Sequence, residues 1–387
     1  MANVLTDLAA DIYQAADIVG RELVGVIPSA TINSNATQVA AQGEVIRAAF
    51  TREVSVDTVT PAMTIPEGTD QTVDNKTMTM SSTASVKIPW TGEDIKYVNN
   101  GAGFDTIYGD QIKQAMRAIT NQIETEVALD IADRASRAVG TAGTTPFSSN
   151  FDDVAEIRQV LVDNGMPSND RQATIVMNSA AGTLLRNLAQ LQKGNESGGV
   201  ELLRRGTLLD LQGIQIKESA GIGSHTAGTA SSATTDAAGY AVGATTITLA
   251  SAGTGTILAG DVITFAGDTN QYCVTTGDGD VSGGGTIVLG ENGLRVAMST
   301  ATKAITMVAT STKNIAFHKS AVEIGVRGLA QPSGGDAAVD RLTVQDPESG
   351  LIYNIAAYKG YNKAMFDVSV LYGYKVWKPE FTAVLLG

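Results

Sequence analysis

The stretch TTGDGDVSGGG, residues 275–285, has the composition of a calcium loop or a phosphate-binding loop, because two aspartates lie among five glycines. A calcium loop of the EF-hand type needs oxygen ligands at its first, third and fifth positions, a glycine at the sixth and a glutamate at the twelfth. Counted from Asp278, the third position is Asp280, but the twelfth is Leu289. No GK[ST] ends a glycine loop, and no G-x-G-x-x-G joins a strand to a helix. We therefore predict a long β-hairpin turn, with calcium at Asp278 and Asp280 as an open hypothesis.

The two histidines and the single cysteine have no reactive partner at a recognisable spacing. His225 lies in a linker rich in Ser, Gly and Thr, and His318 lies in AFHKSAV, so neither has a second histidine placed for a metal. No H-E-x-x-H, G-x-S-x-G or C-x-x-C occurs. A general base at His318 is an alternative, but a hydrogen-bonded structural role is favoured because no nucleophile is near. Cys273 alternates with apolar residues and is predicted to be a small core residue.

Acidic pairs and aromatic residues offer two further candidate sites. GED, residues 92–94, pairs two acids, which in an acidic protein usually mark a solvated face. For the aromatic residues near the C-terminus, packing in the core or at an interface is favoured over a ligand site. The sequence therefore predicts no catalytic, cofactor-binding or metal-binding residue, and no enzyme. The aromatic residues are Tyr353, Tyr358, Tyr361, Phe366, Tyr372, Tyr374, Trp377 and Phe381.

The composition indicates an ordered protein with a surplus of acids. The 387 residues are enough for two or three domains, and 43% of them are hydrophobic. Forty acidic and 27 basic residues give a formal charge of −13, which argues against a protein that wraps nucleic acid, because Lys and Arg neutralise phosphates. One cysteine excludes an intrachain disulfide. The chain shows neither a basic signal region nor an apolar run of membrane length, so a soluble protein without a secretory signal is expected.

The N-terminal part predicts a helix followed by an extended arm. Apolar residues recur at three- and four-residue steps over residues 3–24, the pattern of an amphipathic helix. Residues 44–59 and 76–90 follow strand patterns, and together they predict a long two-stranded arm. An isolated ribbon is marginal in water, so the arm must rest on its own body or on a neighbouring chain. One face of the second strand carries Met78, Met80, Ala84, Val86 and Ile88.

Residues 105–139 form the longest helical pattern. At 1.5 Å per residue such a helix runs about 50 Å, so we predict a spine that is longer than a compact domain needs. Arg117, Asn121, Glu124 and Arg134 fall outside its apolar stripe. The stripe consists of Ile112, Ala115, Ile119, Ile123, Val127, Ile131 and Ala135. Beyond it we predict helices at 152–164 and 179–192, and strands at 173–178 and 213–219.

Residues 223–312 are dominated by Gly, Ala, Ser and Thr. Short apolar strands such as TTITLA, DVITFAG, QYCVTT, GTIVLG and KAITMVA recur there at a spacing of roughly ten residues, which predicts a small antiparallel barrel or sandwich. The loop at 275–285 lies inside this region and joins QYCVTT to GTIVLG.

Three strings resemble the major capsid (coat) proteins of tailed bacteriophages. NIAFHKSAVEIGVRGLAQPSGG, residues 314–335, is similar to their segment in which an AFH strand leads to an apolar strand and a Pro-Gly turn. FDVSVLYGYKVWKPEFTAVLL, residues 366–386, resembles their closing strand. LAGDVITFAG, residues 258–267, is similar to the first hairpin of the extra β-barrel in coat proteins of short-tailed phages of the P22 type. The resemblance covers essentially the whole chain in order.

The resemblance implies the Hong Kong 97-type capsid fold, an α+β fold, here with an inserted small antiparallel β-barrel. The implied parts are an N-terminal arm (1–42), an extended E-loop (43–92), a peripheral domain with the spine helix (93–147), a first axial part (148–222), the inserted barrel (223–312) and a second axial part with the closing peripheral strand (313–387).

The resemblance also implies a structural function without catalysis or cofactor. Such a protein assembles as pentamers and hexamers into an icosahedral shell that encloses double-stranded DNA without reading its sequence. Its implied partners are its own copies, a portal protein and, in some phages, a decoration protein. No membrane partner is implied. Assembly takes place in the cytoplasm of the host bacterium, and the product is the capsid of the virion. Because the chain begins directly with its arm, a separate scaffolding protein is expected.

Some members of the family crosslink a lysine of the E-loop to an asparagine of a neighbour. Lys76, expected near the tip of the arm, is the candidate lysine. No motif identifies the asparagine or a catalytic glutamate, so a crosslink is not predicted.

Two other classes of protein remain as alternatives. An encapsulin-like shell of a cellular compartment shares the implied fold, but such shells usually lack the inserted barrel. A β-rich adhesin or surface-layer protein explains the insertion, yet it calls for a secretion signal and does not need a spine helix.

Overall fold

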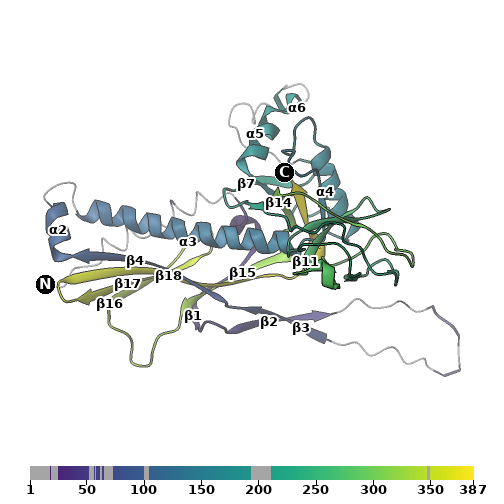
Figure 1. Ribbon diagram of the computed structural model, residues 1–387. Coiled ribbons are helices and arrows are strands. Elements are labelled where there is room, and N and C mark those ends of the chain that lie inside the picture. The colour runs from purple at the N-terminus through teal and green to yellow at the C-terminus, as the bar shows by residue number, and fades with distance from the viewer. Residues whose placement is uncertain are drawn as a thin grey trace.

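The computed structural model describes the chain except for residues 1–17, 19–24, 52–55, 57, 62, 65–72, 100–103, 193–210 and 347–348. It confirms a mixed α+β fold. A long helix lies along one sheet, a second body of strands and short helices adjoins one end of that helix, and a two-stranded arm lies apart from both (Figure 1). The helix predicted at 3–24 lies outside the described residues, apart from Ile18, which is helical.

The spine helix α3 (Phe104–Arg134) confirms the long helical pattern. Every helical residue of its predicted apolar stripe is at most 3% exposed, so the stripe is the face that packs on the sheets. The helix ends before residue 139, where it was predicted to end. Residues Arg137–Val139 instead form strand β5, because two neighbouring strands, β19 and β11, supply its backbone partners.

The helix lies along a six-stranded sheet with the order β1-β15-β18-β17-β16, in which β4 also pairs with β18. The long strand β18 pairs with β17 through its first half and with β15 through its second half, so it joins the whole sheet. The strands are β1 (Thr31–Ala40), β4 (Ser82–Thr91), β15 (Val322–Leu329), β16 (Ala338–Gln345), β17 (Ile352–Gly360) and β18 (Lys363–Val376).

Two tyrosines of the C-terminal aromatic stretch fasten α3 to this sheet. Tyr353 Oη lies 2.7 Å from Thr120 Oγ1, and Tyr372 Oη donates to Glu126 Oε2 at 2.7 Å. Both rings are at most 1% exposed, which confirms core packing for this part of the stretch. Tyr361 differs, since it is 97% exposed at the turn between β17 and β18.

A buried carboxylate joins α3 to two other segments. Glu124 lies outside the apolar stripe, yet it is 4% exposed. Its Oε1 accepts from Val26 N at 2.7 Å and from Ser219 Oγ at 2.6 Å, and its Oε2 accepts from Ile27 N at 3.0 Å. A Cβ at Gly25 would lie 1.9 Å from Oε1, so the backbone can come this close to the carboxylate only because residue 25 is a glycine. Glu124 therefore fixes where the N-terminal segment meets the body.

The second body contains an eleven-stranded sheet with the order β13-β10-β11-β5-β19-β14-β6-β7, to which β8, β9 and β12 also pair. Apart from β5, the strands of this sheet are β6 (Ala173–Met177), β7 (Gln215–Glu218), β8 (Ser224–His225), β9 (Thr246–Leu249), β10 (Val262–Phe265), β11 (Gln271–Thr276), β12 (Gly285–Leu289), β13 (Ile305–Met307), β14 (Ser311–His318) and β19 (Thr382–Leu386). The strands predicted at 173–178 and 213–219 are thus confirmed.

Short helices complete the fold. The helix predicted at 152–164 is α4 (Asp152–Asp163). The single helix predicted at 179–192 is wrong, because Leu188 is extended, with a ψ of 129°, and separates two helices. These are α5 (Ser179–Asn187) and α6 (Ala189–Gln192). The other short helical elements are α2 (Gly92–Asn99) and 3-10 turns at Ile27–Ser29, Val281–Gly283, Lys319–Ala321 and Pro379–Phe381.

The five strands predicted in the insertion are present as β9 to β13. They enclose a hydrophobic cluster of their own, which includes Ile247, Phe265 and Tyr272. The insertion is nevertheless continuous with the main sheet, because β11 pairs with β5 and Cys273 packs in the main core. Closure of these strands into a separate barrel stays a prediction.

The second strand of the arm ends earlier than predicted. Strand β2 (Val45–Thr51) pairs with β3 (Val73–Thr79) in antiparallel register, from Val45 opposite Thr79 to Thr51 opposite Val73. The rest of the predicted strand 76–90 leaves the arm and pairs with β18 as β4. Side chains alternate in the same way in both strands, so the pattern does not reveal the change of partner.

We expect Glu124→Gln to lower the free energy of unfolding by about 2–4 kcal/mol, because the amide nitrogen would face a buried donor where an acceptor is needed. Urea denaturation of the isolated subunit measures the change. The control is Asp110→Asn on the same helix, whose side chain is 69% exposed and 3.5 Å from Lys113 Nζ. This control is expected to change stability by less than about 0.5 kcal/mol. Equal effects of the two variants would contradict the anchoring role of Glu124.

Candidate functional site

The residues that the sequence singled out for chemistry lie apart and have structural roles. His318 Nε2 lies 2.8 Å from Asp170 Oδ2, and its Nδ1 lies 2.8 Å from Ser320 Oγ, which confirms a hydrogen-bonded histidine. Cys273 is fully buried, and this burial raises the pKa of its thiol to about 12. An un-ionised buried thiol is a poor nucleophile, so Cys273 is the core residue predicted.

The loop at 275–285 is the predicted hairpin turn between β11 and β12. Asp278 Oδ1 accepts from Asp280 N at 2.8 Å, and Asp280 Oδ1 accepts from Ser282 N at 3.1 Å and Ser282 Oγ at 2.6 Å. The bonds from Ser282 lower the pKa of Asp280. The carboxylates therefore hold the turn. In the described part of the chain, no three His, Cys, Asp or Glu side chains gather closely enough for a metal ion.

The acidic pair at 92–94 begins helix α2. Thr91 Oγ1 accepts from Asp94 N at 3.1 Å, and Asp94 Oδ2 accepts from Thr91 N at 3.2 Å and from Thr91 Oγ1 at 2.6 Å. This reciprocal arrangement is a capping box, and the bond from Thr91 lowers the pKa of Asp94. Both Glu93 and Asp94 are exposed, as predicted. Among the helices of the described residues, none is long and apolar enough to span a membrane.

A buried polar cluster, which the sequence analysis missed, joins the insertion to the spine. The Lys313 side chain is 4% exposed, its Nζ donates to the Gly260 carbonyl, and it lies 4.0 Å from Asp133 Oδ1. Burial lowers the pKa of Lys313 and raises the pKa of Asp133. His225 Nε2 lies 2.8 Å from the buried Asp261 Oδ1. The sequence signal for this buried cluster was Lys313 itself, a charged residue near the start of the apolar string TKNIAFH.

The root of the arm, residues 76–79 of β3, packs on a pair of glycines in the six-stranded sheet. Gly325 and Gly373 are opposite each other in β15 and β18. A Cβ at Gly373 would lie 2.3 Å from the carbonyl oxygen of Thr79, and a Cβ at Gly325 would lie 2.6 Å from Met78 Cε. The absence of both side chains lets β3 lie directly on the sheet, and Met78 is fully buried there.

Hydrogen bonds also hold the root of the arm to the body. Lys76 Nζ donates to the Trp377 carbonyl at 2.7 Å, and Trp377 Nε1 donates to Glu323 Oε2 at 2.6 Å. Glu323 Oε1 in turn accepts from Asn33 Nδ2 at 2.7 Å. The prediction that Lys76 lies near the tip of the arm is therefore wrong, because Lys76 lies within β3 and contacts the body. The sequence could not show this, because the contact joins residues 301 positions apart.

Beyond its paired strands, the arm presents apolar side chains to solvent. Val56 is 98% exposed, Val59 is 93% exposed and Met63 is 107% exposed relative to a reference residue. Apolar side chains gain free energy when they leave water, at roughly 25 cal/mol per Å². These three residues are thus suited to a surface that another chain covers.

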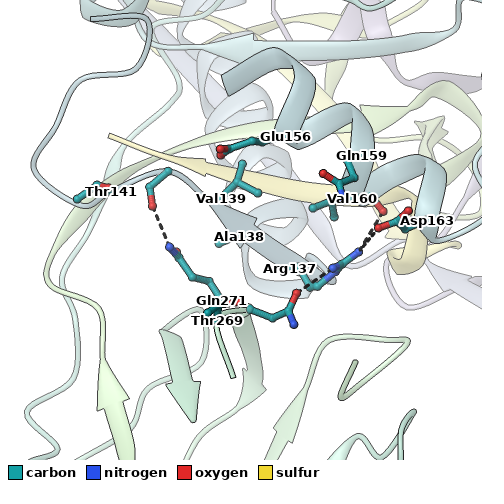
Figure 2. Close-up of a pocket in the computed structure, with 12 residues that line it drawn as sticks. Arg137, Ala138, Val139, Thr141, Glu156, Gln159, Val160, Asp163, Thr269 and Gln271 are labelled. Carbon is teal, nitrogen blue, oxygen red and sulfur yellow. Dashed lines mark hydrogen bonds and ion pairs between the residues drawn. The ribbon is translucent and has the colours of Figure 1, made fainter. Parts of the chain in front are cut away.

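A polar groove of about 410 Å³ lies beside β5 (Figure 2). Its floor is formed by residues 137–141, one wall by α4 and the other by residues 269–271. Arg137 Nη1 donates to Asn270 Oδ1 at 3.2 Å, and its Nη2 lies 3.7 Å from Asp163 Oδ2. Burial, and then the nearby Arg295, lower the pKa of Arg137. Gln271 Nε2 donates to the Gly140 carbonyl at 2.9 Å.

No protein-family model and no curated protein matches the chain. Among solved structures, the chain is similar to one from Mycobacterium phage Che8, with 15% identity over 89% of this chain and 84% of that chain, and a TM-score of 0.49. The capsid structure of the cyanophage P-SCSP1u has 13% identity over 94% and 88% of the two chains and a TM-score of 0.49. A virus-like particle from Pyrococcus furiosus has 11% identity over 98% and 100%, with a TM-score of 0.44. All three scores lie below one half, so the function proposed for this chain depends on its own contacts.

We expect Gly373→Ala to displace the root of the arm, because its Cβ would meet a backbone oxygen that cannot rotate away. The expected cost is about 1–3 kcal/mol, with faster hydrogen exchange of the amides in β3. Gly325→Ala is the graded comparison in the same seat, and it should cost less because its Cβ would meet the flexible end of Met78. Unchanged exchange in β3 of the Gly373→Ala variant would argue against this seat.

Proposed function

We propose that this chain is the major capsid protein of a tailed bacteriophage. Its copies assemble as pentamers and hexamers into an icosahedral shell that encloses packaged double-stranded DNA. One observation carries the proposal: the two-stranded arm rests on its own body only through its root among the described residues, and its far part presents Val56, Val59 and Met63 to solvent. An exposed ribbon of this kind is stable when a neighbouring chain covers it.

The order of parts along the chain supports this proposal. A strand from the N-terminal region, a two-stranded arm, a long spine helix and a β-rich insertion follow one another as the sequence resemblance implies. On this proposal the N-terminal arm is 1–42, the two-stranded arm belongs to the E-loop at 43–92, and the peripheral domain is 93–147. The axial domain is 148–222 and 313–387, the latter with the closing peripheral strand, and the inserted barrel is 223–312. The fold is then of the Hong Kong 97 type.

Surface charge supports the enclosure of DNA without binding to its bases. A chain with a formal charge of −13 repels phosphates, so a wall built from it confines the duplex without trapping it. The proposed partners are copies of this chain, a scaffolding protein encoded separately, a portal protein and, in some shells, a decoration protein. Assembly is proposed to take place in the cytoplasm of the host bacterium, and the virion capsid is the final location.

Negative-stain electron microscopy and sedimentation of the purified protein, alone and with a candidate scaffolding protein, test the proposal. Closed shells of uniform size, or aberrant shells that the second protein corrects, are the expected result. A monomer that never assembles under either condition would overturn it. Shells that assemble uniformly but enclose a cellular enzyme instead of DNA would favour the compartment shell.

We expect the double variant Val56→Asp and Val59→Asp to reduce the yield of shells by more than about tenfold, because the charges would be buried against a neighbour. The melting temperature of the subunit should not change, since both side chains are more than nine-tenths exposed. Val242→Asp, at a residue in the insertion that is 60% exposed, is the control for added charge. Normal shells from the double variant would refute the proposed contact of the arm.

A further inference from the structure

We propose that the polar groove beside β5 takes an extended main-chain segment from a second copy of this chain. The inference rests on the proposed function, because a closed shell places other copies against each subunit. The groove lies where α4, β5 and the start of β11 meet, so it joins the insertion to the rest of the second body.

Uncharged side chains that form hydrogen bonds are the largest class of residue in the lining of the groove. Ala138 and Val139 provide a narrow apolar floor, and amides and hydroxyls surround it (Figure 2). The volume of about 410 Å³ lies within the range of pockets that hold ligands in proteins. The uncharged polar residues are Thr141, Gln159, Thr269, Asn270 and Gln271.

Two polar atoms of the lining have no hydrogen-bond partner among the described residues. They are Arg137 Nε, on a residue that is 7% exposed, and Gln271 Oε1. The first is a donor and the second an acceptor, and Figure 2 shows the two side chains on opposite sides of the floor. Native proteins rarely leave such groups unpaired, and here a donor and an acceptor line the same groove, so a guest that pairs with both is favoured there.

A peptide group matches this unpaired set. Its carbonyl accepts from an N–H such as that of Arg137, and its own N–H donates to a carbonyl such as that of Gln271. A carboxylate satisfies only the donor, and an ammonium group satisfies only the acceptor. Because both atoms are buried in the free subunit, the two side chains must turn toward the segment as it enters.

The charges around the groove also favour a neutral guest. Arg137 lies 3.7 Å from Asp163, so the groove already holds one ion pair. Glu156 lies on the rim, where burial and then Asp153 and Asp152 raise its pKa. These acids repel an anion, while Arg137 and the nearby Arg295 repel a cation. A main-chain segment avoids both costs.

A photo-crosslinking residue at position 159 of the full chain tests this inference in assembled shells. Gln159 is exposed on α4 and lines the groove, whereas Val162, on the same helix, is 39% exposed and does not line it. Shells are assembled from equal amounts of normal and nitrogen-15 chains, irradiated and examined by mass spectrometry. The expected result is a crosslink between chains from position 159 to one extended segment, at least about tenfold stronger than from position 162.

The outcomes separate this inference from the proposed function. Shells that form normally but show no crosslink between chains at position 159, or equal crosslinks at 159 and 162, would overturn the inference alone. A crosslink to a different protein would also overturn it. A chain that never forms shells would overturn both proposals.

Two substitutions give a second measurement. Gln159→Trp fills the groove from its rim, so the yield of shells should fall by more than about tenfold while the melting temperature of the subunit stays the same. Gln159→Ala leaves the space open and should assemble within about twofold of the unaltered protein. Normal assembly of the Trp variant would contradict an occupied groove.

Discussion

The packing of one face of α3 against two sheets is the contact on which the rest of the molecule depends. The helix contacts β4 and β18 in one sheet and β11, β14 and β19 in the other, so one row of side chains joins two sheets that share no strand. Each such side chain contributes about 1.5–3 kcal/mol when fully buried. A second constraint acts at the middle of the helix, where the Glu124 carboxylate holds both the N-terminal segment and the loop at Ser219. The two sheets are therefore placed relative to each other by a rigid rod.

The two-stranded arm of β2 and β3 is held at its root, where β3 lies on the six-stranded sheet. Its root is held by shape at Gly325 and Gly373 and by hydrogen bonds through Lys76 and Trp377. Its far part presents apolar side chains to water. A strong root and an uncovered far part are the properties of an element that makes contact with another molecule. The exposed part of the arm is therefore the surface on which the proposed assembly depends.

Buried polar groups lie where the insertion meets the spine helix and the rest of the second body. The insertion has a hydrophobic cluster of its own, yet it is tied to the spine through Lys313, Gly260 and Asp133. Burial disfavours the charged form of both Lys313 and Asp133, so this junction is held mainly by its geometry and by the bond to the Gly260 carbonyl. The polar groove lies at another junction of the insertion, and it brings an unpaired donor, Arg137 Nε, and an unpaired acceptor, Gln271 Oε1, into one lining. This combination is the reason to expect a partner in the groove.

Elements with a local signal were predictable from the sequence. The spine follows from apolar residues at helical spacing, the insertion strands from short apolar runs between glycines, and the turn at Asp278 from its composition, because each depends on neighbours within a few residues. The tertiary structure alone decided which partner each segment takes. Residues 137–139 were predicted in the helix but form strand β5, and residues 82–91 pair with β18 instead of extending the arm. Glu124 is buried although it lies outside the apolar stripe. Lys76 and the groove at Arg137 belong to the same class, since their contacts join residues far apart in the chain. Periodicity records which face of a segment is apolar, but it contains no information about the segment that will cover that face.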